Sequence, residues 1–323
     1  MRSSNERRVL FAFALLAVNA LALSAQAQPS AQGFAVNRLY PSAAGAGWLV
    51  MDSLDMHGGL GGAMSFTAGY ANHPLRVSQG AQQLSVVSDQ TLVAFGFAAT
   101  YERFRLSLNL DAPLISHGQS GTVGGYKLAA PLLGLGSHPD ILSDPRVGLD
   151  ARIFGSAASP LRLGVGAQLI IPNGERVHYD TDHTYRAMAR ALVAGDLGMF
   201  TYAGQLGVHV RPLDDSPIPG SPRGSELLFG VAGGARLPLG TSRSAALIVG
   251  PEIYGATAFR SLLGSNATAL EGLLTGRIEG TADDGPQPRV KLGVGAGLNP
   301  HFGAAEWRVV LAVELFGRNT ARN

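Results

Sequence analysis

The sequence predicts an all-β protein, an antiparallel transmembrane β-barrel of about twelve strands behind an N-terminal signal peptide. The first observation is a set of segments of about ten residues with apolar side chains at every second position. The clearest segment is 103–111, whose apolar members are Phe104, Leu106, Leu108 and Leu110. Because side chains alternate across a strand, such a segment has one apolar and one polar face.

The second observation is an export signal at the start of the chain. A basic beginning is followed by an apolar core over 9–23 and by the small-residue cleavage site Ala25-Gln26-Ala27. We therefore predict a signal peptide at 1–27. Its removal takes three Arg and one Glu from 25 basic and 23 acidic residues, which leaves a formally neutral chain. Charge therefore gives no indication of nucleic-acid binding.

Composition supports strands with one lipid-facing side. The chain is 46% hydrophobic and 15% charged, yet beyond the signal peptide it has no apolar run long enough for a helical membrane span. Many of the 43 Gly lie opposite the aliphatic residues of a segment, as in 161–169, where a curved inner wall has little room. The absence of Cys excludes disulfides, a thiol nucleophile and thiolate metal sites. A soluble β-sandwich is the alternative, but one core could not cover so many apolar faces.

Strands are expected near 62–78, 84–101, 103–112, 144–155, 160–171, 184–196, 199–211, 224–237, 242–255, 268–280, 287–299 and 305–316. Tight connections are expected at 101–103, 155–160, 196–199 and 238–241, and long ones at 112–143, 172–183, 212–223 and 256–267. This alternation is typical of short periplasmic turns and long extracellular loops. An even strand count places both ends of the barrel, 62–316, in the periplasm.

The segment before the barrel, 28–61, has three interpretations. It could be periplasmic, it could lie in the lumen, or its stretch 48–54 could add a strand, which would make fourteen the alternative count if another strand is also missed. Alternation is mixed in 84–101 and 268–280, so the register of those strands is poorly defined. After the barrel we expect a short tail, 317–323.

Aromatic residues and the last strand support a membrane location. Rings near the predicted strand ends favour the lipid headgroup level; they are Tyr101, Phe104, Phe154, Phe200, Tyr202 and Trp307. The final strand alternates outward-facing apolar residues and ends in Phe316. Such a strand is typical of those that barrel-assembly machinery recognises.

Several stretches resemble the barrel region of OmpA-family proteins of deltaproteobacterial, especially myxobacterial, type. They are Asn37-Arg38-Leu39-Tyr40-Pro41, Gly47-Trp48-Leu49-Val50, Asp52-Ser53-Leu54, Gly69-Tyr70-Ala71, Pro74-Leu75, Asp89-Gln90, Asn109-Leu110-Asp111-Ala112-Pro113-Leu114, Asp144-Pro145-Arg146-Val147-Gly148-Leu149, Pro251-Glu252-Ile253-Tyr254-Gly255 and Gly295-Ala296-Gly297-Leu298. The resemblance implies a barrel fold and an outer-membrane address. Such proteins usually continue into a peptidoglycan-binding domain, which is not expected here because the sequence stops at Asn323.

The predicted inner face is rich in charge. Its thirteen basic and seven acidic residues are Arg103, Arg105, Arg146, Arg152, Arg162, Arg186, Arg190, Arg211, Arg236, Arg277, Arg289, Lys291 and Arg308, with Asp111, Asp150, Glu226, Glu252, Glu271, Glu279 and Glu314. One hypothesis is an ion-pair network that fills a narrow barrel. The other is a water-filled pore whose Arg excess favours anions. If Leu106, Leu108 and Val165 face lipid while Arg105 and Arg162 face inward, Leu108→Arg should cost on the order of 2–4 kcal/mol near the membrane midplane. Arg105→Ser should cost much less.

Polar clusters in the predicted loops are candidates for other chemistry. His178, Asp180, Asp182 and His183 could ligate a divalent cation or supply an Asp and His pair for hydrolysis. Looser groupings are Asp111 with His117, and His138 with Asp140 and Asp144. No Gly-x-Ser-x-Gly turn and no dinucleotide fingerprint is present. A solvated loop is the default interpretation, so we expect no metal, no cofactor and no catalytic residue.

The sequence therefore predicts a non-enzymatic outer-membrane β-barrel of a Gram-negative cell, structural or weakly porin-like. The alternative is a channel or transporter for a specific small solute, hydrophobic solutes included, with the N-terminal segment as a lumenal plug. A hydrolase or lipid-modifying enzyme is a further hypothesis. Expected partners are outer-membrane lipids, lipopolysaccharide and the barrel-assembly machinery, whereas nucleic acid and peptidoglycan are not expected.

Overall fold

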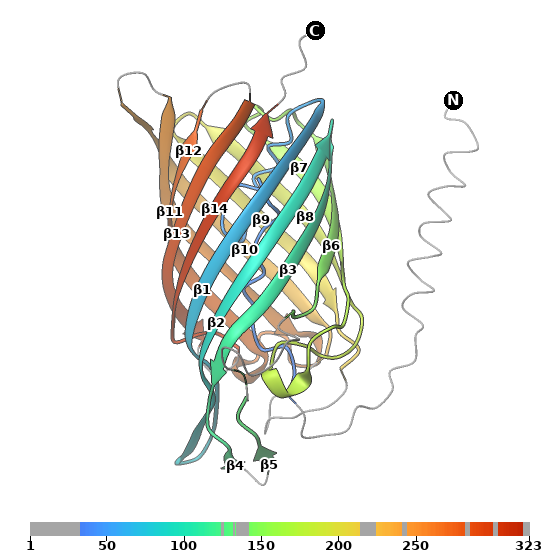
Figure 1. Ribbon diagram of the computed structural model, residues 1–323, viewed down its shortest axis with the longest axis vertical. Helices are drawn as coiled ribbons and strands as arrows, with labels where there is room; N and C mark the ends of the chain where they lie inside the picture. The colour runs from blue at the N-terminus through green and yellow to red at the C-terminus, as the bar shows by residue number, and fades with distance from the viewer. Residues whose placement is uncertain are drawn as a thin grey trace, which may run out of the picture.

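A computed structural model describes residues 33–123, 126–131, 133, 142–213, 224–240, 244–281, 285–299 and 303–318. Twelve strands close into one antiparallel barrel in the order β1-β14-β13-β12-β11-β10-β9-β8-β7-β6-β3-β2 (Figure 1). They are β1 (Leu60–Gln79), β2 (Gln82–Tyr101), β3 (Phe104–His117), β6 (Arg146–Phe154), β7 (Arg162–Ile170), β8 (Arg186–Leu197), β9 (Phe200–Val210), β10 (Glu226–Leu239), β11 (Ala245–Ala258), β12 (Thr268–Gly280), β13 (Gly285–Asn299) and β14 (Trp307–Arg318). The expected fold is confirmed, with twelve strands rather than fourteen. The expected signal peptide lies outside the described residues, as do 319–323.

The alternation in sequence becomes alternation in exposure. Along β7 each inward residue is buried and each outward residue is exposed. Leu106, Val165 and Leu311 are among the large apolar side chains that face outward, and the inner wall carries small or charged residues. Since a belt of this kind is stable only against lipid, the barrel is of the transmembrane type. Among the described residues no helix is long and apolar enough to span a membrane.

The two ends of the barrel differ. One end, the short-turn end, carries the tight β2–β3, β6–β7, β8–β9 and β10–β11 connections. At the other, the long-loop end, β1 and β2 extend as a hairpin beside the small pair β4 (Gly121–Val123) and β5 (Tyr126–Leu128) (Figure 1). The 3-10 helices η1 (Arg176–His178), η2 (Phe259–Ser261) and η3 (Ser265–Ala267) follow strands at this same end. The predicted order of short and long connections is thus observed.

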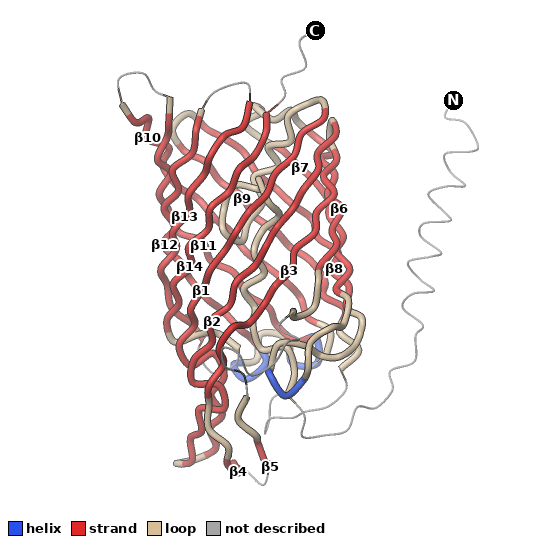
Figure 2. The backbone as a smooth tube through the Cα atoms, in the orientation of Figure 1, coloured by secondary structure: helices blue, strands red, loops and turns tan. Residues whose placement is uncertain are grey.

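Residues 33–59 run through the lumen from the long-loop end to the short-turn end (Figure 2). Near one end Val36 N donates to Tyr179 O of the β7–β8 loop, and near the other Glu102 N donates to Gly59 O beside the start of β1. Between these points Trp48, Met51 and Leu54 are fully buried. We call residues 33–59 the plug. It does not join the sheet, so the stretch 48–54 adds no barrel strand.

Candidate functional site: the plug and its charged wall

The centre of the plug is a compact turn over 42–53. Ser42 N donates to Leu49 O at 2.9 Å and Ser53 N donates to Ala46 O at 2.8 Å. Gly47 has a φ of 99°, and a Cβ at this position would lie 2.6 Å from Ser53 Oγ. A larger residue there would be strained and crowded, so the small-residue run 43–47 is what lets the chain fold back within the barrel.

Glycines of the wall make room for the apolar side chains of the plug. A Cβ at Gly234 of β10 would lie 2.9 Å from the Trp48 ring, and a Cβ at Gly230 or Gly293 would overlap Met51 or Leu49. The glycines that sequence alternation places on the inner face therefore accommodate the plug. In the lumen, the plug residues join barrel residues such as Ile248 in one apolar cluster.

Glu252 of β11 holds the tip of the plug turn. Its Oε1 accepts from Leu49 N at 2.9 Å, and its Oε2 accepts from Val50 N at 2.9 Å and from Met51 N at 3.3 Å. Thr275 Oγ1 also donates to Oε1, at 2.8 Å. The carboxylate is thus satisfied by three consecutive backbone N–H groups and one hydroxyl. Such charge-assisted bonds are among the stronger contacts available to buried backbone.

Basic side chains of the wall bind the carbonyl groups and carboxylates of the plug. Arg105 Nη2 lies 2.9 Å from Asp52 Oδ1, and Arg152 Nη1 donates to Leu54 O at 3.0 Å. Lys291 Nζ donates to Trp48 O at 3.1 Å, while the Arg277 guanidinium lies 4.8 Å from the Trp48 ring centroid. The wall therefore binds both the backbone and the side chains of the plug.

Other charges pair across the strands of the wall itself. Arg308 contacts Glu271 at 2.8 and 3.0 Å. Arg190 pairs with Asp150 at 2.9 Å. Toward the short-turn end Arg289 lies 2.8 Å from Glu279 and 3.0 Å from Glu314, and Glu314 also binds Lys291 at 2.6 Å. Because each charge has a partner of opposite sign, burial of these groups is compensated.

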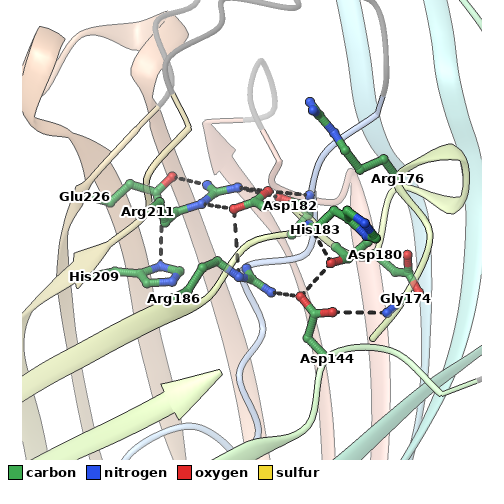
Figure 3. Close-up of polar contacts among 12 residues, drawn as sticks. Asp144, Gly174, Arg176, Asp180, Asp182, His183, Arg186, His209, Arg211 and Glu226 are labelled. Carbon is green, nitrogen blue, oxygen red and sulfur yellow. Dashed lines mark hydrogen bonds and ion pairs between the residues drawn. The ribbon is translucent and has the colours of Figure 1, made fainter. Parts of the chain in front are cut away.

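A separate charged cluster closes the long-loop end (Figure 3). Arg211 binds both oxygens of Asp182 at 2.6 Å and reaches Glu226 at 2.7 Å. Arg38 of the plug binds the same Glu226 oxygen at 2.8 Å, and Ala35 N donates to Asp182 at 2.9 Å. Burial raises the pKa of Asp182, but the neighbouring guanidiniums, Arg211 first, hold it well below its usual range. Two carboxylates thus fix the start of the plug.

Asp144 organises the adjacent loop. Its Oδ1 accepts from Asn173 N at 2.9 Å and Gly174 N at 3.2 Å, and its Oδ2 accepts from Thr181 Oγ1 at 2.8 Å and Arg186 at 2.6 Å. This carboxylate, which lies just before β6, therefore holds the β7–β8 loop and the first residue of β8 in place.

The residues expected in the lumen lie mostly inside it. Those that are buried are Arg105, Arg146, Asp150, Arg152, Arg162, Arg186, Arg211, Glu226, Glu252, Glu271, Arg277, Glu279, Arg289, Lys291, Arg308 and Glu314. Arg190, Asp111 and Arg236 are partly exposed. Arg103 is instead exposed in the β2–β3 turn, because β3 begins at Phe104.

The four candidate metal ligands do not converge. His178 is buried with Glu175 as a neighbour at 3.8 Å, Asp182 is engaged by Arg211, and His183 is exposed. Within the described ranges no three His, Cys, Asp or Glu side chains are grouped to hold a metal. His138 and Asp140 lie outside the described residues.

An Asp and His pair forms at the long-loop end. His117 Nδ1 lies 2.8 Å from Asp89 Oδ1, between paired residues of β2 and β3. The neighbouring Ser88 Oγ donates to Asp89 Oδ2 at 2.9 Å rather than to the imidazole. The pair thus lacks the arrangement in which a histidine accepts from a nucleophilic hydroxyl.

The main feature that the sequence left open is the extent of the plug's contacts. Asp52 and Arg38 were not assigned to the site, because their partners Arg105 and Glu226 are distant in sequence. The apolar run 48–51, directly after the small residues 43–47, was the signal for a buried segment.

No protein-family model and no curated protein matches the chain. Among solved structures, the chain is similar to the COG4313 outer membrane channel from Pseudomonas putida F1, at 12% identity and a TM-score of 0.48 over 80% of this chain and 96% of that one. It is also similar to the CymD monoaromatic hydrocarbon channel, at 10% identity and a TM-score of 0.42 over 84% and 91%, and to LpxR from Salmonella typhimurium, at 10% and 0.37 over 79% and 100%.

Proposed function

We propose that this chain is a non-enzymatic outer-membrane β-barrel whose own N-terminal segment closes the lumen. The observation that carries the proposal is the burial of the plug. Trp48, Met51 and Leu54 are inaccessible to water, and Glu252 binds three successive plug amides. A water-filled pore along these residues would leave such groups hydrated. The resting barrel is therefore closed, and its role is structural or that of a gated channel.

The membrane assignment within this proposal is the outer membrane of a Gram-negative cell. An apolar outer face, aromatic side chains exposed at the strand ends such as Tyr101 and Trp307, and the export signal in the sequence support it. Lipids, lipopolysaccharide and the barrel-assembly machinery are the partners that follow from this location. Kinship with OmpA-family barrels is supported by the motif stretches of the sequence alone.

The second candidate is a channel for a specific small solute with a movable plug. The contacts of the plug favour this second candidate. The plug is held by side chains of the wall and by turns within itself, and its backbone does not pair with the barrel strands. It is joined covalently to the barrel where β1 begins, at Leu60. Such a segment can be displaced without breaking the sheet. The structural and the gated versions differ only in whether displacement occurs.

Planar-bilayer recording with a lockable plug tests the proposal. A Cβ at Gly96 would lie 3.6 Å from Ala44 Cβ, within the usual range for a disulfide, and the chain has no Cys of its own. The same Cβ would overlap Ser65 Oγ, so the variant also carries Ser65→Ala to remove that oxygen. We expect this Ala44→Cys/Gly96→Cys/Ser65→Ala variant to crosslink and to show no steady conductance. Reduction of the disulfide should return the conductance of the variant to that of the unmodified chain.

An internal deletion of residues 34–59 is the complementary variant, and it should conduct steadily. Heat-modifiable migration on gels checks that each variant has folded. A large ohmic conductance through the locked barrel would contradict the proposal, because it would require a pore beside the plug.

A further inference from the structure

A small cavity lies between the plug and the wall at the long-loop end. It has a volume of about 50 Å³ and is bordered by Tyr40 of the plug, Asp111 and Arg146 of the wall, and Asp180 and Arg186 near β8. One water needs roughly 10–15 Å³ of such space. The cavity therefore has room for a molecule of about four or five non-hydrogen atoms.

Several buried polar atoms that border the cavity lack a protein hydrogen-bond partner in the described part of the chain. They are the donors Tyr40 Oη, Arg146 Nε and Arg186 Nη1 and the acceptors Asp111 Oδ1 and Asp180 Oδ1. Arg146 Nε lies 3.4 Å from Asp111 Oδ2, an ion pair that makes no hydrogen bond and leaves Asp111 Oδ1 unused. Arg146 and Arg186 are only 2% and 3% exposed. Buried polar groups are rarely left without partners, because each costs free energy when unsatisfied. Their grouping around one cavity indicates a polar occupant.

The charges around the cavity limit the kinds of molecule that could bind in it. Donors on two guanidiniums and a phenol can receive a carboxylate, while two carboxyl groups can receive an ammonium. Asp144 does not compete, since both of its oxygens are already bonded. A pure anion or a pure cation would satisfy only one half of the cavity and leave the other half unpaired.

We propose that this cavity binds a small zwitterion of the size of glycine, with its carboxylate toward Arg146 and Arg186 and its ammonium toward Asp111 and Asp180. The Asp111 side chain is 24% exposed and lies just beyond the last β3–β6 pair, Asn109 with Arg146. The solute can therefore enter the cavity past the exposed part of the Asp111 side chain. The site deepens the solute-channel form of the proposed function and rests on it for its use in transport.

Isothermal titration calorimetry of the folded, detergent-solubilised chain tests the site. Glycine should bind saturably, and its two halves, acetate and methylammonium, should each bind at least tenfold more weakly. Alanine, one carbon larger, should also bind more weakly because of the small volume. Binding is measured without conductance, so this inference and the plugged-barrel proposal can fail separately.

Matched variants assign the binding to the cavity. Asp111→Asn should weaken glycine binding by about tenfold or more, and Tyr40→Phe, which keeps the ring, by about fivefold, as expected for the loss of one hydrogen bond. Asp89→Asn, at the same end of the barrel but paired with His117, should leave the affinity unchanged. Absence of saturable glycine binding would overturn the proposal. Equal binding of acetate or methylammonium, or an unaffected Asp111→Asn variant, would do the same.

Discussion

Glu252 on the barrel wall lies against Leu49 of the plug, with Oε1 2.9 Å from the Leu49 backbone nitrogen. The next two amides of the plug bind the other oxygen of the same carboxylate. A single wall residue thus fixes the direction of three successive peptide groups in the middle of the lumen. The first prediction follows from this contact.

Glu252→Gln should destabilise the barrel by roughly 1.5–3 kcal/mol, the usual worth of hydrogen bonds to a charged group. The variant puts an amide NH₂ where a carboxylate oxygen now accepts, so donors would face donors. Reversible unfolding from lipid vesicles measures the cost, and hydrogen exchange should quicken at residues 49–51. Glu306→Gln is the matched control, since Glu306 is half-exposed and pairs with Arg76 at 3.2 Å. If both variants cost the same, Glu252 does not hold the plug.

Leu108→Arg should destabilise the barrel by about 2–4 kcal/mol, because it places a charge on the lipid side of β3. The sequence alone suggested a much smaller cost for Arg105→Ser. The structure changes that expectation: Asp52 would be left buried without its partner, at a cost of about 3–5 kcal/mol. Arg103→Ser, in the exposed turn, should cost almost nothing. If the folding free energies measured in lipid showed equally small costs for Arg105→Ser and Arg103→Ser, the contact between Arg105 and Asp52 of the plug would be refuted.

Stability of the β7–β8 loop should fall with rising pH. Burial, with the nearby Asp144 charge, raises the pKa of Asp180 from 3.8 to about 7. Because the folded state holds the proton more tightly, this stabilising contribution is complete below about pH 4 and is lost as the pH rises through about 7. Hydrogen exchange of residues 171–185, corrected for intrinsic rates, should show less protection at pH 8.5 than at pH 5.5. Asp180→Asn should remove the difference, and an unchanged difference in that variant would assign it to another group.

Alternation allowed the barrel to be predicted from sequence and left the plug undetermined. In a barrel strand every second residue faces lipid and must be apolar. Segments such as 103–111 and 161–169 therefore show in the sequence which of their residues face outward. The segment 33–59 meets a different neighbour at each position, Glu252 at Leu49 and Arg105 at Asp52. No periodicity encodes such contacts. Arg103 was misplaced for a related reason, since one residue decides whether a side chain ends a turn or begins a strand.

The last prediction concerns the selectivity of the barrel once the plug is gone. Among the described residues, buried charges on barrel strands comprise nine basic and six acidic groups: Arg105, Arg146, Arg152, Arg162, Arg186, Arg277, Arg289, Lys291 and Arg308, with Asp150, Glu226, Glu252, Glu271, Glu279 and Glu314. Deletion of 34–59 also removes Asp52, which leaves Arg105 without its acid partner. The opened lumen should therefore attract anions.

A reversal potential measured across a KCl gradient should show this anion preference for the deletion variant. The preference should weaken as salt rises beyond physiological strength, where the Debye length falls below about 8 Å and the wall charges are screened. Adding Arg105→Ser to the deletion should reduce it, because that guanidinium no longer has Asp52 to neutralise it. A cation preference in the deletion variant would instead show that acids of the loops control permeation, Asp180 and Asp182 among them.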